Sequence, residues 1–225
     1  MRAFVVGAAV LAIGVPPALG SQVGIQVDTQ DGTPRYTAVF VGAEWEGNKV
    51  SVGIEGGGGT IYFKDFGGKM GSNPPVGDER CAVYQNTAYC TLPVALGQFS
   101  AIQTTLGDRA STYADFKLTD YPVVERVIGG AGDDRIDLHN GQSIVSEFSG
   151  TNAILLQDDA FGTVNVHNGL DNYVNVRNGK IDDVTCDLSA WDRGLGIPDS
   201  PLHGVSDYVQ ADDTDHVTGC EQDLL

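Results

Sequence analysis

The chain has 225 residues, in which 30 acidic side chains oppose 13 basic ones, and its formal net charge is −17. A surface this acidic argues against nucleic-acid binding, which depends on cationic contacts to phosphates. Scattered surface acids also serve simple solubility. Here they concentrate in residues 126–225, which hold eighteen acids and five bases, so bound cations are expected there.

Residues 1–20 have the features of a secretory signal peptide. Arg2 precedes an apolar run from Ala3 to Val15, and small residues lead to an expected cleavage after Gly20 or after Ala18. The apolar run is shorter than the roughly 20 residues that a membrane span requires. We therefore expect a secreted, extracellular protein without a membrane span, and we expect it to be a monomer.

Residues 21–100 are expected to form an N-terminal β-rich cap. Apolar and polar side chains alternate over 23–27, 36–41, 50–54 and 61–63, which predicts strands separated by glycine-rich turns. A further alternating stretch, 123–128, leads into the centre of the chain. Such a cap would cover the open edge of whatever sheet follows it.

The four cysteines favour two disulfides, because an exported chain matures in an oxidising compartment and the spacing fits no zinc motif. Three pairings are possible. Cys81–Cys90 and Cys186–Cys220 are favoured, because each couple brackets its own turn-rich segment. Residues 186–225 would then form a C-terminal cap held by a disulfide.

The central stretch 128–137 predicts a glycine turn, then a metal-ligand position, then a strand. It fits the nonapeptide G-G-x-G-x-D-x-U-x, in which U is a large apolar residue. Counting onward in nines and tens predicts buried side chains at Ile136, Val145, Ile154, Val164 and Tyr173, and ligand positions at Asp134, Ser143, Asn152 and Asp171. Asp115 is placed about two repeats before Asp134, on the same edge. The period predicts an all-β chain whose residues 101–185 form a parallel β-roll or β-helix solenoid, with asparagine ladders at its turns.

The turns of this repeat predict calcium sites. Ca²⁺ takes six to eight oxygen ligands, many of them carbonyls and carboxylates, and a glycine turn followed by an aspartate supplies both. In a β-roll every second turn falls on the same edge, so the turn at 129–134 would stack on the turn at 147–152. The expected ligands are backbone and side-chain oxygens of Gly129, Gly130, Ala131, Gly132, Asp134 and Asn152, with Asp159 serving the opposite edge.

Residues 129–137 resemble the hemolysin-type calcium-binding repeat of the RTX proteins, which implies a parallel β-roll or β-helix with Ca²⁺ between its turns. The order of Tyr36–Ala38, Cys90–Pro93, Asp183–Cys186 and Val217–Glu221 around the repeat is similar to that of secreted bacterial proteins of the same class, most of which have no assigned activity. Toxin or protease activity is not implied, because the chain has an N-terminal signal and no pore-forming or protease domain.

The sequence thus predicts a non-catalytic, secreted calcium-binding solenoid. The alternative is a polysaccharide-acting enzyme, such as a lyase, or a carbohydrate-binding or adhesion module that meets an extracellular polysaccharide or cell-surface component. No H-E-x-x-H or G-x-S-x-G motif is present. A concave face with convergent acids, bases and aromatic rings would favour the alternative.

Overall fold

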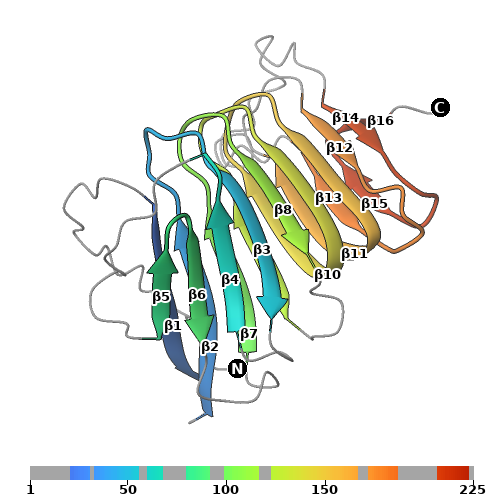
Figure 1. Cartoon of the computed structure of the whole chain (residues 1–225). Helices are drawn as coiled ribbons and strands as arrows, with labels where there is room; N and C mark the ends of the chain where they lie inside the picture. Colours follow the sequence, from blue (N-terminus) through green and yellow to red (C-terminus); the bar gives the residue numbers. More distant parts are fainter. Residues whose placement is uncertain are drawn as a thin grey trace, which may run out of the picture.

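The computed structural model describes residues 21–30, 33–55, 60–67, 80–91, 99–116, 123–166, 172–186 and 207–222. The expected signal peptide, residues 1–20, lies outside these ranges, as does Asp171. Within them every helix or strand is a β-strand, as predicted, and all sixteen strands belong to one mixed sheet (Figure 1).

The strands fall in chain order as follows: β1 (Gln22–Gln30), β2 (Thr33–Val41), β3 (Lys49–Glu55), β4 (Thr60–Asp65), β5 (Cys81–Tyr84), β6 (Thr87–Thr91), β7 (Phe99–Thr105), β8 (Thr112–Phe116), β9 (Val124–Ile128), β10 (Arg135–Glu147), β11 (Ala153–Val166), β12 (Tyr173–Asn175), β13 (Asp183–Thr185), β14 (Tyr208–Gln210), β15 (His216–Thr218) and β16 (Glu221–Gln222). The expected strands near 23, 36, 50, 61 and 123 are all present. Strands β7 and β8 were not predicted.

The parallel pairings form two rows of strands. Row A contains β3, β8, the first part of β10, the first part of β11, β12, β14 and β16. Row B contains β2, β7, β9, the second part of β10, the second part of β11, β13 and β15. From β7 onward the chain alternates between the rows. Strands β10 and β11 each cross from row A to row B through a bend, marked by positive φ at Gly141 and Asp158.

Inward-facing aliphatic side chains of both rows belong to one buried cluster. In row A, Ile136 pairs in register with Ile154, and Ile154 with Val174; in row B, Val145 pairs with Val164. Each of these side chains is fully buried, which contributes about 1.5–3 kcal/mol per residue. The prediction of buried side chains is confirmed at Ile136, Val145, Ile154 and Val164. It is wrong at Tyr173, which is half-buried, because its neighbour Val174 takes the inward position.

Antiparallel strands flank the rows at the N-terminal end. β1 pairs with β2, while β4, β6 and β5 extend row A beyond β3. The Cys81–Cys90 disulfide joins directly opposite residues of β5 and β6. Strands β1 to β6 show that this region is β-rich, as expected, and the disulfide confirms the first favoured cysteine pairing.

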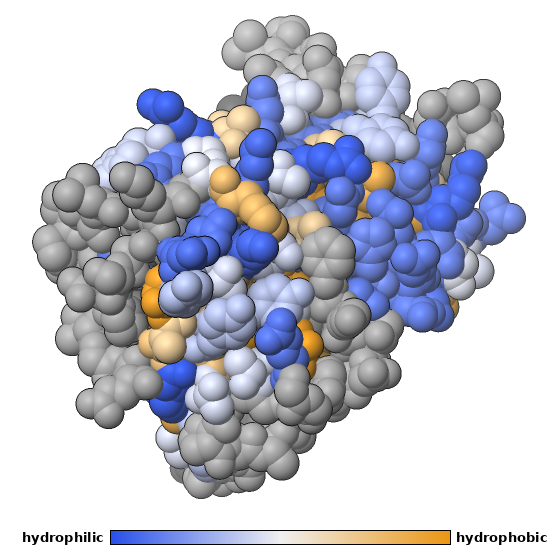
Figure 2. All heavy atoms as spheres, viewed as in Figure 1, coloured by the Kyte–Doolittle hydropathy of each residue, from blue (hydrophilic) through white to orange (hydrophobic). Residues whose placement is uncertain are grey.

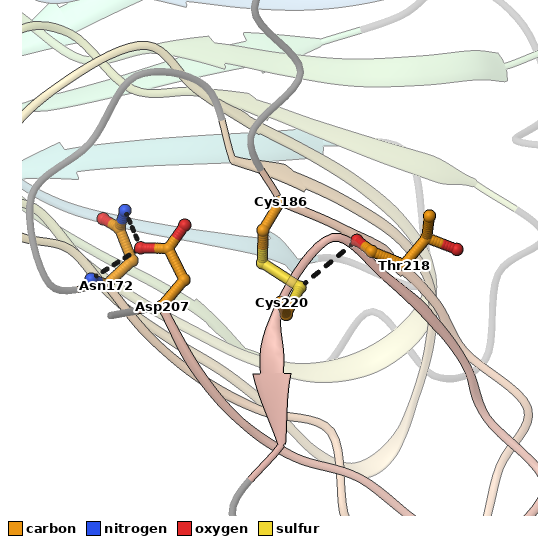
Figure 3. The surroundings of a disulfide bond; sticks show 5 residues. All are labelled: Asn172, Cys186, Asp207, Thr218 and Cys220. Atoms are coloured by element: carbon orange, nitrogen blue, oxygen red, sulfur yellow. Dashed lines mark hydrogen bonds between the residues drawn. A yellow bond between two sulfur atoms is a disulfide. The ribbon is translucent and has the colours of Figure 1, made fainter. Parts of the chain in front are cut away.

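The C-terminal end of the rows is held by short strands and by the Cys186–Cys220 disulfide, which confirms the second favoured pairing. Cys186 follows β13 and Cys220 lies between β15 and β16, so the bond ties the end of β13 to the turn that joins the last two strands (Figure 3). Two disulfides indicate that the protein matures in an oxidising environment.

Candidate functional site

The turn at 129–134 connects β9 in row B with β10 in row A, and we call the stacked turns at this position the glycine corner (residues 42–48, 106–111, 129–134 and 148–152). The glycines of these turns allow the backbones of neighbouring turns to come into contact. A Cβ at Gly130 would come within 2.2 Å of the Gly107 carbonyl oxygen, and one at Gly150 within 2.1 Å of the Gly132 carbonyl oxygen. The turns at 129–134 and 147–152 therefore lie against each other, as the sequence predicts.

A continuous set of hydrogen bonds, which we call the corner ladder, joins the polar residue that precedes each row A strand. In each step a side-chain oxygen accepts the backbone N–H of the corresponding residue one turn earlier: Ser111 from Asn48 (3.2 Å), Asp134 from Ser111 (2.8 Å), Asn152 from Asp134 (2.9 Å), Asn172 from Asn152 (3.0 Å) and Asp207 from Asn172 (3.0 Å). The ladder satisfies buried backbone donors that no strand pairing reaches. Two of its five acceptors, Asn152 and Asn172, are asparagines, and Asn172 lies one residue after the predicted ligand position Asp171.

Asp134 is a buried member of this ladder, with 2% of its surface exposed. Its Oδ1 accepts the Ser111 N–H and its Oδ2 accepts the Gly130 N–H at 3.2 Å. Burial raises the pKa of Asp134 to about 6, although the two N–H groups act in the opposite direction. The carboxyl group thus already has a structural role, and only its remaining lone pairs are open to a cation.

Glu147 supplies a second buried carboxyl group at the glycine corner, and sequence analysis missed it. Its side chain is fully buried, and within the described residues neither Oε1 nor Oε2 has a hydrogen-bond partner. It occupies the space left by the absent side chain of Gly129. Burial raises the pKa of Glu147 to about 9, and the nearby charge of Asp134 adds to this shift. Side chains alternate along a strand, so inward-facing Val145 also predicts an inward-facing side chain at residue 147. The sequence therefore contained the information needed to predict Glu147 as buried.

The remaining predicted ligands divide into two groups. Asn152 lies beside Asp134, but its Oδ1 accepts the Asp134 N–H and its Nδ2 donates to the Asn172 side chain and the Ser149 carbonyl. Asp159 lies at the opposite end of the row A strands, where it is 66% exposed and pairs with Lys180 at 3.0 Å. Asp159 is therefore not part of the glycine corner, in keeping with its predicted place on the other edge.

Two further acids lie at the bend opposite the glycine corner. Asp115 accepts the His139 N–H at 2.6 Å and the Asn140 side-chain amide at 2.9 Å, so its predicted place on the same edge as Asp134 is wrong. Asp182 accepts the Gly162 N–H at 2.6 Å, and burial raises its pKa to about 6. Both carboxyl groups act as acceptors for backbone donors of neighbouring turns.

The carboxyl groups of Glu147 and Asp134 decide whether the glycine corner suits a cation. In the described ranges no three His, Cys, Asp or Glu side chains gather into a metal-binding group. A cation there would depend on two carboxyl groups and on backbone carbonyls, which is a donor set that calcium accepts and zinc disfavours. The two carboxyl oxygens of Glu147, which have no hydrogen-bond partner among the described residues, are the observation that fits such an ion.

Comparisons with known protein families, with curated proteins and with solved structures found no significant match. Within the residues that the structure describes, no helix has the length and apolar character needed to cross a membrane.

Proposed function

We propose that this protein is a secreted, non-catalytic β-solenoid module whose glycine corner binds Ca²⁺. In this proposal the alternating rows A and B are successive coils of a parallel β-roll, of the kind that the resemblance of residues 129–137 to the RTX repeat implies. The two disulfides support an extracellular location, and the N-terminal segment 1–20 would direct export.

The observation that carries the calcium proposal is the carboxyl group of Glu147. A buried carboxyl without a hydrogen-bond partner is costly to the fold, and it becomes favourable only if it is neutralised or meets a cation. Glu147 and Asp134 would hold the ion together with carbonyl oxygens of the turn at 129–132. The ion would neutralise two buried carboxylates whose charges otherwise repel each other.

The consequence of binding is stabilisation by linkage. An ion that binds the folded corner and not the unfolded chain shifts the folding equilibrium by RT ln(1 + [L]/Kd), which is about 1.4 kcal/mol at ten times the dissociation constant. For a domain of this size that corresponds to a rise in melting temperature of about 4 °C. Calcium would tune this fold, since the apolar core and both disulfides do not depend on it.

The test is a calorimetric melt of the chelator-treated protein with and without added CaCl₂. We expect a calcium-dependent rise in the melting temperature of the wild type and none in Glu147→Gln. Asp134→Asn should lose most of the rise while it keeps the corner ladder, because Asn152 and Asn172 already show that an asparagine fits this position.

The matched control is Asp213→Asn, which removes an exposed acid from the turn between β14 and β15 and should leave the calcium effect intact. Identical melts of the wild type in calcium and in chelator would overturn the proposal. An equal rise in Glu147→Gln would show that calcium acts elsewhere on the chain.

A further inference from the structure

The outer face of β3, β4 and β6 carries a hollow of about 360 Å³. Figure 2, drawn from the same side as Figure 1, shows this side of the molecule as a mixture of hydrophilic and weakly polar residues with small hydrophobic patches. Three aromatic rings and four polar chains line the hollow: Ser51, Glu55, Tyr62, Lys64, Phe66, Thr87 and Tyr89.

Strand register explains why these side chains meet. Gly53 of β3 lies opposite Tyr62 of β4, and Tyr62 lies opposite Tyr89 of β6. A Cβ at position 53 would come within 2.4–2.6 Å of the Tyr62 hydroxyl oxygen and two carbons of its ring, so the side chain packs on the glycine. Directly opposite residues in an antiparallel pair are close enough for their side chains to touch. The floor of the hollow is therefore set by the backbone.

Contacts also restrain the side chains around the hollow. The ammonium group of Lys64 lies 4.4 Å from the centre of the Phe66 ring, a cation–π contact. Tyr62 is half-buried, and its burial and the charge of Glu55 raise its pKa. Tyr89, Thr87 and Ser51 are also half-buried. The half-buried rings of Tyr62 and Tyr89 thus have restricted positions, which lowers the entropy lost when a ligand binds, whereas Phe66 is exposed at the rim.

The chemistry of the lining points to one class of ligand. Six of the seven side chains carry an oxygen or nitrogen that can hydrogen-bond, and the rings of Tyr62, Tyr89 and Phe66 offer apolar faces. Glu55 and Lys64 balance each other in charge. A neutral pyranose has the matching character, because its hydroxyl groups form a polar edge and its C–H groups form an apolar face. Single-stranded nucleic acid also stacks on aromatic rings, but a net charge of −17 opposes it.

We propose that this hollow is a binding site for a neutral oligosaccharide, or for a short stretch of a neutral polysaccharide chain. The site lies on the N-terminal antiparallel strands and uses none of the residues of the glycine corner. It is therefore independent of the proposed calcium function, and either proposal can fail without the other.

The experiment is isothermal titration of the full chain with neutral hexaoses: cellohexaose, laminarihexaose, mannohexaose and chitohexaose. We expect at least one of them to bind, with equal affinity in calcium and in chelator. Tyr89→Ala should weaken binding about tenfold, and Glu55→Gln should weaken it less, because it retains a hydrogen-bonding side chain.

The matched control is Tyr208→Ala, which removes a half-exposed tyrosine from β14 at the far end of row A and should leave binding unchanged. Thermal melts of each variant separate lost binding from lost folding. The proposal is overturned if none of the four hexaoses binds, if Tyr208→Ala and Tyr89→Ala weaken binding equally, or if a single-stranded oligonucleotide binds at the same tyrosines in preference to the sugars.

Discussion

The carboxyl group of Glu147 lies directly over the α-carbon of Gly129, where a Cβ would come within 1.7 Å of Glu147 Oε2 and 2.2 Å of its Cδ. Gly129 belongs to the repeat turn, whereas Glu147 ends the following row B segment. The glycine therefore makes room for a buried acid at the end of β10, in addition to any role in the turn itself.

Gly129→Ala should destabilise the protein by about 1–3 kcal/mol, the usual cost of overfilling a packed site. The double variant Gly129→Ala/Glu147→Ala should recover most of this loss, because the clash disappears when the carboxyl is removed. Urea denaturation of the wild type, both single variants and the double variant gives the coupling energy. Strict additivity of the two changes would contradict the contact.

Stability should fall as pH rises because of Glu125. This side chain is fully buried, its Oε1 accepts a hydrogen bond from the Tyr113 hydroxyl, and burial raises its pKa from 4.5 to about 8. Between these values the folded state keeps a proton that the unfolded chain has released, so the free energy of unfolding decreases from about pH 4.5 to about pH 8. The upper limit of the change is roughly 5 kcal/mol, at 1.36 kcal/mol per pKa unit.

Glu125→Gln isolates this contribution, because glutamine keeps an acceptor for Tyr113 and carries no proton to titrate. We expect the difference in unfolding free energy between variant and wild type to grow in favour of the variant from pH 5 to pH 8, in chelator throughout. A difference that stays constant over this range would mean that Glu125 does not titrate there.

Asn172→Ala tests the corner ladder. The side-chain oxygen of Asn172 accepts both the backbone N–H and the side-chain amide of Asn152. Its removal leaves buried donors without a partner, at about 1–3 kcal/mol each, so we expect a loss of about 2–4 kcal/mol in urea denaturation. Asn172→Asp keeps the acceptor but replaces the amide that donates to Asp207 at 2.8 Å with a second carboxyl group, so it should not recover the loss. Asn165→Ala, on the outward-facing side of β11, is the surface control, and a similar loss there would argue against the ladder.

The two disulfides should contribute unequally. In the chain-entropy description, the Cys186–Cys220 bond, with a sequence separation of 34, stabilises by about 4 kcal/mol, and the Cys81–Cys90 bond, with a separation of 9, by about 3 kcal/mol. We expect Cys186→Ala/Cys220→Ala to increase hydrogen exchange in β13 to β16 while β3 to β6 stay protected. Uniform loss of protection would show instead that both ends unfold together.

The elements that sequence predicted best are those where one signal dominates. Apolar alternation predicted β1 to β4 and β9. The count in nines and tens predicted the inward positions from Ile136 to Val164, because β10 and β11 pair in parallel register and place their core residues at nearly equal spacing. The spacing of the corner ladder then grows from 18 residues between Asp134 and Asn152 to 20 between Asn152 and Asn172. The predicted series took one step of ten, from Ile154 to Val164, and then a step of nine, so it reached Tyr173 in place of Val174.

The site was harder to predict because its residues come from different turns. Asp134 was found from its place after the glycines, but its hydrogen bonds go to Ser111 and Asn152, which lie far from it in sequence. Glu147 was overlooked because it sits at the end of a strand and not in a turn. The hollow around Tyr62 depends on the register of three antiparallel strands, which no local pattern specifies.

All hydrogen bonds of the corner ladder run in the same direction along the chain. In every step the later residue supplies the accepting side chain and the earlier one supplies the donor, so each turn completes the turn synthesised before it. Shortening the chain from its C-terminus would remove the acceptor of the last remaining turn, whereas shortening it from its N-terminus would leave a side-chain oxygen without its donor. When the chain is synthesised from its N-terminus, the buried N–H at the growing end of the ladder therefore lacks its acceptor until the next turn is in place.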